Sequence, residues 1–247
     1  MIIENKSVLI TGGGSGIGRA LAIHFAKSGS QVLICGRNRE SLLVTASYMP
    51  EKIDVVVADI ANQEGRNVIK EAVSSRGVSL DILINNAGIQ NKLDFATGES
   101  ANRNSSMIEL EIAINFTAPI LLTLDLLDHL TKPGGAVVNV TSLLALHPKA
   151  SAPIYCATKA GIRSFTRSLR QQLTRKSVSV IEVVPPLVET AMTEGYGNGK
   201  ITPDQAAIEI IEGLQVRKEL IKIGRSKIIY LLDRFFPEFV AKMMVKA

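Results

Sequence analysis

The chain has 247 residues, of which 46% are hydrophobic and 21% are charged, a composition that excludes global disorder and supplies enough apolar side chains for a substantial core. Its 28 Lys and Arg exceed its 23 Asp and Glu, giving a net charge of +5, but the basic residues are spread along the chain without a run of about five like charges. With aromatic residues at 4% and no Trp, the composition argues against a nucleic-acid partner.

Cysteine and histidine are too few and too scattered to indicate a disulfide framework or a metal site. Cys35 and Cys156 have no CxxC companion, and His24, His129 and His147 lie far apart. We therefore expect two small core residues and no metal. The N-terminus lacks the pattern of a cleaved signal, and no uninterrupted apolar run reaches about 18 residues, so a cytoplasmic location is the default expectation.

In the first third of the chain, short apolar segments alternate with amphipathic ones. Strands are predicted at Ser7–Thr11, Gln31–Cys35, Asp54–Ala58 and Asp81–Asn85. Helices are predicted after the first glycine cluster, at Arg39–Tyr48 and at Gln63–Ser75. Strands that are apolar almost throughout, each followed by a helix, are typical of a parallel sheet covered on both faces.

The same alternation continues beyond residue 107. It predicts a helix at Met107–Leu130, a strand at Ala136–Thr141, a helix at Tyr155–Arg175 and a strand at Ser177–Val184. No linker-like change of composition interrupts the pattern, so residues 1–247 are expected to form one α/β domain.

Two C-terminal segments differ from this pattern. Residues 191–202 are rich in Gly and polar side chains and predict a mobile substrate loop, with a helix resuming near Pro203. Residues 227–247 form an apolar helical tail in which Pro237 limits any single helix. The tail is interpreted either as helices docked on the core or on a second subunit, or as an amphipathic contact with a membrane surface.

A glycine cluster leaves the first predicted strand and opens the first helix. It reads TGGGSGIG over residues 11–18, which places Gly12, Gly14, Ser15, Gly16, Ile17 and Gly18 at the turn. Glycine lets the backbone approach a pyrophosphate closely, and the N–H groups and dipole of the following helix face the anion. In this position the motif predicts a dinucleotide site.

The residue after the second strand bears on the choice of cofactor. An acid there would bind the ribose 2′-hydroxyl of NAD, whereas a basic residue accommodates the 2′-phosphate of NADP. The chain has Gly36 followed by Arg37, so NADP(H) is favoured and NAD(H) remains possible. Asp59 and the run 85–88 follow the third and fourth strands, at the sheet edge where such folds bind ligands. Asp59 could equally cap a helix.

Tyr155 and Lys159 are four residues apart, so they share one face of a helix. A nearby ammonium favours the phenolate form and would bring the pKa of Tyr155 toward a useful range. Ser142 ends the preceding strand, where its hydroxyl could orient a substrate carbonyl. Alone each signal is weak, but together with the glycine motif they indicate proton-transfer chemistry.

Taken together, these residues resemble the short-chain dehydrogenase/reductase family over nearly the whole chain. The matching pieces are TGGGSGIG (11–18), NNAG (85–88), Asn115, Ser142 and YCATK (155–159). The resemblance implies a Rossmann-type, doubly wound sheet of about seven strands and a homodimer or homotetramer. It also implies hydride transfer between nicotinamide and a carbonyl or secondary alcohol.

The resemblance further assigns residue roles. It implies that Tyr155 is the general acid/base, that Lys159 lowers its pKa and binds the nicotinamide ribose, that Ser142 polarises the carbonyl and that Asn115 holds a water in a proton relay. The cofactor contacts that it implies in addition to the glycine motif and Arg37 are Asp59, Ile60, Asn86, Ala87, Gly88, Tyr155, Lys159, Pro185, Val188 and Thr190.

One departure from the family pattern is Pro186, where glycine is usual; it should stiffen the stretch after the last predicted strand. Pro186, NNAGIQ and PIYCATK are similar to an oxidoreductase branch associated with lipoteichoic-acid D-alanylation operons (DltE-like). Leu143, Leu144, Leu146, Pro148 and Ile154 would border the cleft and suggest an apolar or amphipathic small-molecule substrate, although the same residues could be packing.

Two other functions compete with this interpretation. A non-catalytic dinucleotide sensor or interaction protein could use the same fold, although the full set of catalytic residue types argues against it. An epimerase or dehydratase would usually have a longer substrate region than the segment after Thr190 provides.

Overall fold

The computed structural model describes residues 1–77, 79–95, 105–130, 134–195 and 197–245. One residue of the predicted substrate loop, Tyr196, and the last two residues of the predicted tail, Lys246 and Ala247, lie outside the described residues.

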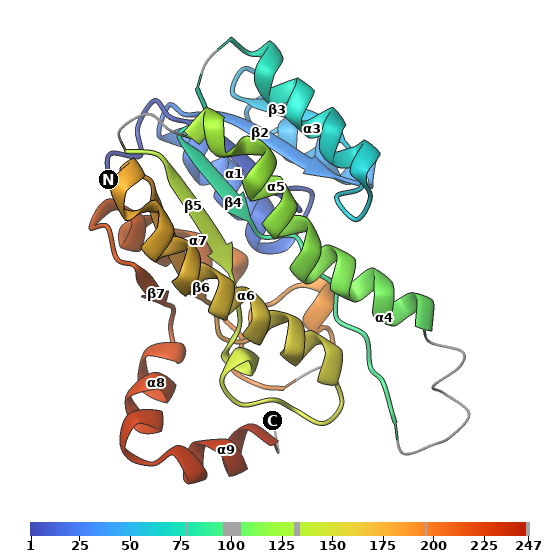
Figure 1. Ribbon diagram of the computed structural model, residues 1–247, viewed down its shortest axis with the longest axis vertical. Coiled ribbons are helices and arrows are strands. Elements are labelled where there is room, and N and C mark those ends of the chain that lie inside the picture. The colour runs from blue at the N-terminus through green and yellow to red at the C-terminus, as the bar shows by residue number, and fades with distance from the viewer. Residues whose placement is uncertain (78, 96–104, 131–133, 196, 246–247) are drawn as a thin grey trace.

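Seven parallel strands form one sheet in the order β3-β2-β1-β4-β5-β6-β7 (Figure 1). The strands are β1 Ser7–Thr11, β2 Gln31–Gly36, β3 Ile53–Val57, β4 Ile82–Asn85, β5 Ala136–Val140, β6 Ser179–Val184 and β7 Leu220–Lys222. The chain winds outward in both directions from β1 and β4, so the predicted doubly wound parallel sheet is confirmed. Six strands lie within two residues of their predicted bounds.

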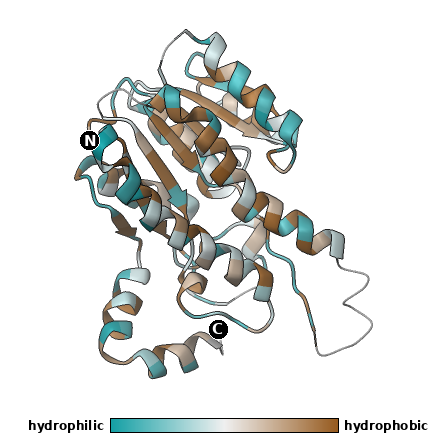
Figure 2. Ribbon diagram, viewed as in Figure 1, coloured by the Kyte–Doolittle hydropathy of each residue, from teal (hydrophilic) through white to brown (hydrophobic). Residues whose placement is uncertain are grey.

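Helices cover both faces of this sheet. They are α1 Gly16–Lys27, α2 Arg39–Ala46, α3 Gln63–Ser75, α4 Ser105–Ile112, α5 Ala118–Leu126, α6 Pro153–Leu173, α7 Pro203–Gln215, α8 Ser226–Phe235 and α9 Pro237–Val245. Apolar residues of α1, α2 and α7 join one core cluster, and those of α3, α5 and α6 join the other. Figure 2 shows the apolar strands between these layers.

Alternation along each strand divides the sheet's side chains between the two cores. In β1, Val8 and Ile10 pack against α1 and α7, while Leu9 points to the opposite face. All three are fully buried. Because both faces of the sheet are covered, most positions of the central strands are apolar.

The predicted helix Met107–Leu130 is interrupted. A π-helical turn, Ala113–Thr117, separates α4 from α5, and a 3₁₀ turn, Leu127–Leu130, ends the segment. By length and composition alone Ser105–Leu130 could cross a membrane. Leu122 and Leu126 of α5 are nevertheless completely buried in the core of the domain, which explains the apolar composition.

The sequence pattern missed β7, whose three residues are too few to show a period. The C-terminal tail forms two helices that meet at Pro237, as its position predicts. We call α8 and α9 together the C-terminal hairpin. Its inner residues Val240 and Met244 pack with Leu143 and Val184, whereas Phe235, Phe236 and Phe239 are more than half exposed.

Candidate active site

A cleft of about 680 Å³ opens at the carboxyl ends of the strands. It lies where the strand order reverses between β1 and β4, the position at which open α/β sheets bind ligands. Most of the predicted cofactor and catalytic residues line it: Gly12, Ser15, Gly16, Ile17, Arg37, Asp59, Ile60, Asn86, Ala87, Gly88, Ser142, Tyr155, Lys159, Pro185, Val188 and Thr190. Gly14, Gly18 and Asn115 are absent from its described lining.

The turn after β1 depends on glycine at two positions. Gly12 has φ +70, a conformation that side chains with a Cβ rarely adopt, and its N–H donates to the carbonyl of Cys35 at 2.9 Å. Gly18 has no room for a side chain, because a Cβ there would lie 2.2 Å from the carbonyl oxygen of Gly12. The helix that follows therefore starts directly against the strand end, with its N-terminus at the cleft.

The N-cap of α1 is suited to an anionic group. Ser15 occupies the cap position in extended conformation and its side chain makes no capping hydrogen bond. The first turn of α1 contains no acidic residue, so no carboxylate competes for the positive end of the helix dipole.

Thr11 and Asn86 join β1 to β4 beneath the cleft. The Thr11 hydroxyl accepts the N–H groups of Asn86 and Ala87, both at 3.0 Å, and the Asn86 side chain donates to the Thr11 carbonyl at 2.9 Å. These bonds fix the backbone of the segment after β4. Thr11 was not singled out from the sequence, because its role depends on a partner 75 residues away.

Arg37 and Asp59 lie at the end of the cleft formed by β2 and β3. The Arg37 side chain is exposed at the cleft, and its guanidinium makes no hydrogen bond or ion pair with any residue that the structure describes. Asp59 accepts the N–H of Ala61 at 3.0 Å. The cap of α3 is Asn62, which accepts the N–H of Gly65, so the capping alternative for Asp59 is wrong for that helix.

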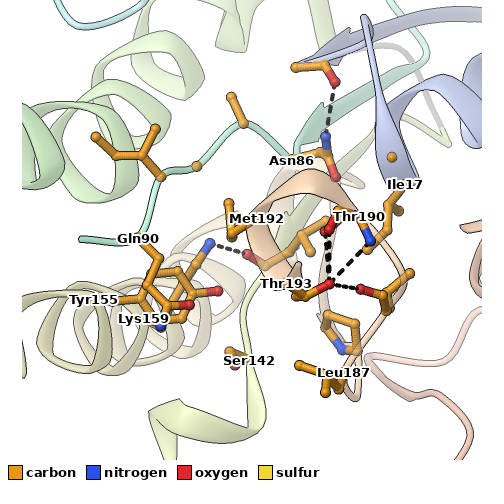
Figure 3. Close-up of a pocket in the computed structure, with 18 of the residues that line it drawn as sticks. Ile17, Asn86, Gln90, Ser142, Tyr155, Lys159, Leu187, Thr190, Met192 and Thr193 are labelled. Atoms are coloured by element: carbon orange, nitrogen blue, oxygen red, sulfur yellow. Dashed lines mark hydrogen bonds between the residues drawn. The ribbon is translucent and has the colours of Figure 1, made fainter. Parts of the chain in front are cut away.

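Tyr155 and Lys159 lie on one face of α6 and are both buried (Figure 3). The Lys159 ammonium lies 5.6 Å from the centre of the Tyr155 ring and donates to the carbonyl of Val140 at 2.8 Å. Figure 3 also shows Gln90 beside this pair and Ser142 below it. The predicted phenol and ammonium therefore do meet at the cleft.

Burial is the main influence on the pKa values of both groups. Burial raises the pKa of Tyr155 to about 12, with a hydrogen bond to Ser142 acting in the opposite direction. Burial also lowers the pKa of Lys159 to about 8. Loss of hydration is the largest cause of the shift at Tyr155, and the role of Lys159 in lowering the pKa of Tyr155 stays a prediction.

Ser142 follows β5 closely, and its hydroxyl opposes the effect of burial on the pKa of Tyr155. The hydroxyl accepts the N–H of Leu144 at 3.1 Å. This bond caps a short 3₁₀ turn, Leu143–Ala145. This turn fixes the hydroxyl in the cleft.

Asn115 lies in the π-helical turn and holds the loop that follows β4. Its side-chain oxygen accepts the N–H of Ile89 at 2.8 Å, and its amide donates to the Ile89 carbonyl at 2.7 Å. One turn earlier, the buried Glu111 accepts both the backbone and the side-chain N–H groups of Asn91. Gln90 is thus presented to the cleft between two anchored neighbours.

The sequence pattern gave no indication of Glu111. The residue is completely buried, one of its carboxylate oxygens has no partner among the described residues, and burial raises its pKa. An acidic residue in an amphipathic helix is usually a solvated side chain, so only packing against α6 reveals this one.

The segment after β6 forms another wall of the cleft. Pro185, Pro186, Leu187 and Val188 line it, followed by Thr190 in extended conformation at a short 3₁₀ turn, Ala191–Thr193. The ends of the predicted substrate loop are joined by a bridge between Val188 and Ile201. Its mobility stays a prediction.

The apolar lining was predicted in part. Leu143 and Leu144 line the cleft, whereas Leu146, Pro148 and Ile154 are absent from its described lining. Residues that the sequence pattern did not identify complete it, notably Met192 from the loop, Arg225 immediately before α8, and Ile229 and Met244 from the C-terminal hairpin. The hairpin could not be assigned to the cleft from the sequence, because its contacts are made only through the tertiary fold.

The structure also bears on the cysteines and on possible metal ligands. Cys35 and Cys156 are both buried and unpaired, so their predicted role as small core residues is confirmed. Within the described parts of the chain, no group of three or more His, Cys, Asp and Glu side chains could hold a metal ion.

Comparison with known proteins places these features in a family. The family model for short chain dehydrogenases matches residues 6–200. The chain is 40% identical over 228 residues to the uncharacterized oxidoreductase DltE of Bacillus subtilis (strain 168), covering 90% of this chain and 89% of that protein. It is 29% identical over 226 residues to an uncharacterized oxidoreductase of Staphylococcus aureus (strain USA300), covering 89% and 95%.

Solved structures show the same fold. A short chain dehydrogenase from Burkholderia cenocepacia J2315 in complex with NADP has a TM-score of 0.86 and 24% identity over 99% of both chains. A short-chain dehydrogenase from Sphingobium yanoikuyae in complex with NADPH has a TM-score of 0.80 and 24% identity, over 98% of this chain and 95% of that one. Because the family model covers most of the residues that form this cleft, the chain belongs to the short-chain dehydrogenase/reductase family of oxidoreductases.

Proposed function

We propose that the protein is an NADP(H)-dependent oxidoreductase that interconverts a carbonyl compound and a secondary alcohol, with Tyr155 as the general acid/base. The observation that carries the proposal is the meeting of Tyr155, Lys159 and Ser142 at the cleft that also contains the glycine turn. Bound NADPH would supply the hydride.

The residues of the cleft fit this cofactor. Gly12 permits the tight turn after β1, and the absence of a Cβ at Gly18 lets α1 begin directly against the end of that strand. The side chain of the cap residue Ser15 makes no capping hydrogen bond, so the N-terminus of α1 suits a pyrophosphate. Arg37 provides a guanidinium beside the end of β2, in position for a ribose 2′-phosphate. Two structurally similar dehydrogenases were solved with NADP or NADPH. NAD(H) is the alternative cofactor, because NADH is bound in the structure of a 3-ketoacyl-(acyl-carrier-protein) reductase from Brucella melitensis, which is 27% identical with a TM-score of 0.80.

The remaining cofactor contacts follow the walls of the cleft. Asp59 and Ile60 border the adenine side, and Asn86, Ala87 and Gly88 provide a flat backbone surface after β4. Pro185, Val188 and Thr190 face them from the segment after β6. Lys159 would bind the nicotinamide ribose, since its ammonium is held at the cleft by Val140.

The proton steps follow from the burial of the two groups. A Tyr155 pKa of about 12 keeps the phenol protonated at neutral pH, which suits donation to the carbonyl oxygen during reduction. Ser142, which lines the same cleft, would polarise the same oxygen. The relay role of Asn115 would require a water near the Ile89 backbone, because both ends of its amide are bonded there.

The test combines cofactor binding with turnover. NADPH and NADH are titrated by nicotinamide fluorescence against the wild type, and a carbonyl panel is then assayed with wild type and Tyr155→Phe. We expect NADPH to bind more tightly than NADH and Tyr155→Phe to bind NADPH normally but lose nearly all turnover. If neither cofactor binds at millimolar concentration, the proposal fails. If Tyr155→Phe retains the biological function without turnover, a non-catalytic sensor is the better interpretation. If it retains the wild-type turnover, Tyr155 is not the general acid/base.

We also propose a cytoplasmic homodimer or homotetramer. The exposed apolar side chains of the C-terminal hairpin, together with Met107 and Leu124 of the α4–α5 segment, are candidate contacts between subunits. Sedimentation velocity measures the assembly state. A peripheral membrane contact of the hairpin is the less favoured use of the same side chains, and vesicle co-sedimentation tests it.

A further inference from the structure

The charged residues of the cleft are distributed unevenly. The described lining contains four cationic side chains, those of Arg37, Lys149, Lys159 and Arg225, and a single acidic one, that of Asp59. Arg37 and Asp59 follow β2 and β3, at one side of the sheet. The other cations lie toward β5, β6 and β7, where no described lining residue is acidic. The part of the cleft next to β5, β6 and β7, where the substrate would bind, is therefore lined by cationic side chains.

Arg225 and Lys149 are the cations on this side that the proposed mechanism does not use. Arg225 is the one held against the substrate loop. It immediately precedes α8, and Ile229, one turn further along the helix, also lines the cleft. The Arg225 guanidinium packs on Gly199 of the substrate loop, where a Cβ would lie 2.5 Å from both of its terminal nitrogens. Glycine at position 199 thus leaves the space that the guanidinium occupies.

The guanidinium of Arg225 has donors without acceptors. It forms no hydrogen bond or ion pair with any residue in the described part of the chain, whereas its neighbour Lys227 is paired with Glu209 at 2.6 Å. A guanidinium has five N–H donors in a planar fork that matches a carboxylate or a phosphate. Because the guanidinium of Arg225 is held against Gly199 at the cleft, it is suited to bind such an anion.

Apolar side chains occupy the space around this charge. Leu187 and Met192 line the cleft from the loop side, and Ile229 and Met244 from the C-terminal hairpin. Lys149, which precedes α6, adds a second positive charge to the lining. A ligand that satisfies this arrangement has an apolar chain and an anionic head.

From this arrangement we infer that Arg225 forms an anion subsite and that the substrate is an amphipathic carbonyl compound carrying a carboxylate or phosphate group. The inference rests on the proposed oxidoreductase function, because it places this group in the cleft that Tyr155 faces. An anchored head would hold the apolar chain, and with it the reacting carbon, in a constant orientation relative to Tyr155.

The test measures binding by calorimetry with sodium octanoate, octyl phosphate and neutral octanamide as probes. Each is titrated into the wild type with and without NADP⁺. One charge-assisted contact at a partly exposed site corresponds to about a tenfold difference in affinity. We therefore expect at least one anionic probe to bind about tenfold more tightly than octanamide. The tighter of the two identifies the head group.

Three variants separate the subsite from general effects of charge. Arg225→Gln should reduce the preference for the anion to less than threefold, and Arg225→Lys should restore part of it. Arg234→Gln removes the same charge from α8 at an exposed residue outside the described lining, where the guanidinium lies over the Phe235 ring, and should leave the preference intact. Circular dichroism and NADPH titration verify that each variant is folded.

Several results would overturn the inference. Equal affinity of the wild type for octanamide and both anions would show that no anion subsite exists, as would equal losses in Arg225→Gln and Arg234→Gln. If Arg225→Gln weakened NADPH binding about tenfold, the guanidinium would belong to the cofactor site instead. If the wild type bound neither NADPH nor NADH, the proposed function would fail. The probe titrations without NADP⁺ would still decide whether the anion subsite exists.

Discussion

Burial of Lys159 should make this lysine a cost to stability, so Lys159→Met is expected to stabilise the protein while abolishing turnover. Burial lowers the pKa of Lys159 from 10.5 to about 8. Each pKa unit is worth about 1.4 kcal/mol, so the buried ammonium lowers the free energy of unfolding by about 3 kcal/mol at pH 7. Loss of the Val140 hydrogen bond offsets about 1–2 kcal/mol of the gain.

The pH dependence is the sharper part of this prediction. A lysine whose pKa is lower in the folded state loses its proton first in that state, so the wild type gains stability as the pH rises from about 8 towards 10.5. The advantage of Lys159→Met should therefore shrink by about 2.5 kcal/mol between pH 7 and pH 10. Lys70→Met makes the same replacement at an exposed helical lysine and should show no such trend.

The assay is urea unfolding followed by circular dichroism at several pH values and one protein concentration, because assembly would otherwise alter the apparent stability. A constant difference between Lys159→Met and the wild type across this range would refute the reasoning. So would a variant that is less stable than the wild type at pH 7 and falls further behind at lower pH. Either result would mean that the ammonium is well solvated in the folded protein.

Three further predictions concern the rest of the cleft. Arg37→Glu should weaken NADPH binding by about 30-fold or more and change NADH binding less than threefold; equal changes in the two dissociation constants would remove Arg37 from the 2′-phosphate site. Gly18→Ala should lower the free energy of unfolding by about 1–3 kcal/mol, because the added Cβ would meet the carbonyl of Gly12. Gly36→Ala is the control: its Cβ would lie 3.6 Å from the nearest atom, in the Leu42 side chain, so the free energy of unfolding should change by less than about 0.5 kcal/mol. Thermal unfolding compares the two, and similar losses would contradict the steric argument. Because burial raises the pKa of Glu111, the wild type should lose stability relative to Glu111→Gln as the pH rises from the ordinary carboxyl range through that raised pKa; parallel stability curves from urea unfolding would show that the carboxyl titrates normally.

Local patterns were sufficient for the sheet and for the cofactor end of the cleft. Strands buried on both faces are apolar at most positions, as Val8, Leu9 and Ile10 illustrate, and such runs are visible without a structure. The glycine turn and the Tyr155–Lys159 spacing are also local, since each is contained within a few consecutive residues.

The features that the sequence pattern missed depend on residues far apart in the chain. The hydrogen bonds between Glu111 and Asn91 and between Thr11 and Asn86 join separate segments of the chain. The spacing of apolar residues along the sequence gives no indication of such pairs. The interruption of the predicted helix at Asn115 likewise coincides with its bonds to Ile89. β7 was missed because three residues cannot establish a period of two.

The sequence by itself determined the alternation of strands and helices, the position of the glycine turn and the placement of Tyr155 and Lys159 on one helix face. Only the tertiary structure decided the direction in which the pKa of Tyr155 moves, because that depends on burial by residues from several elements. It also brought Arg225 to the cleft, through packing of the C-terminal hairpin against the end of the sheet. Residue types and their spacing show which chemical groups are available. How well those groups are hydrated, and which of them lie close together, depends on the packing of distant segments.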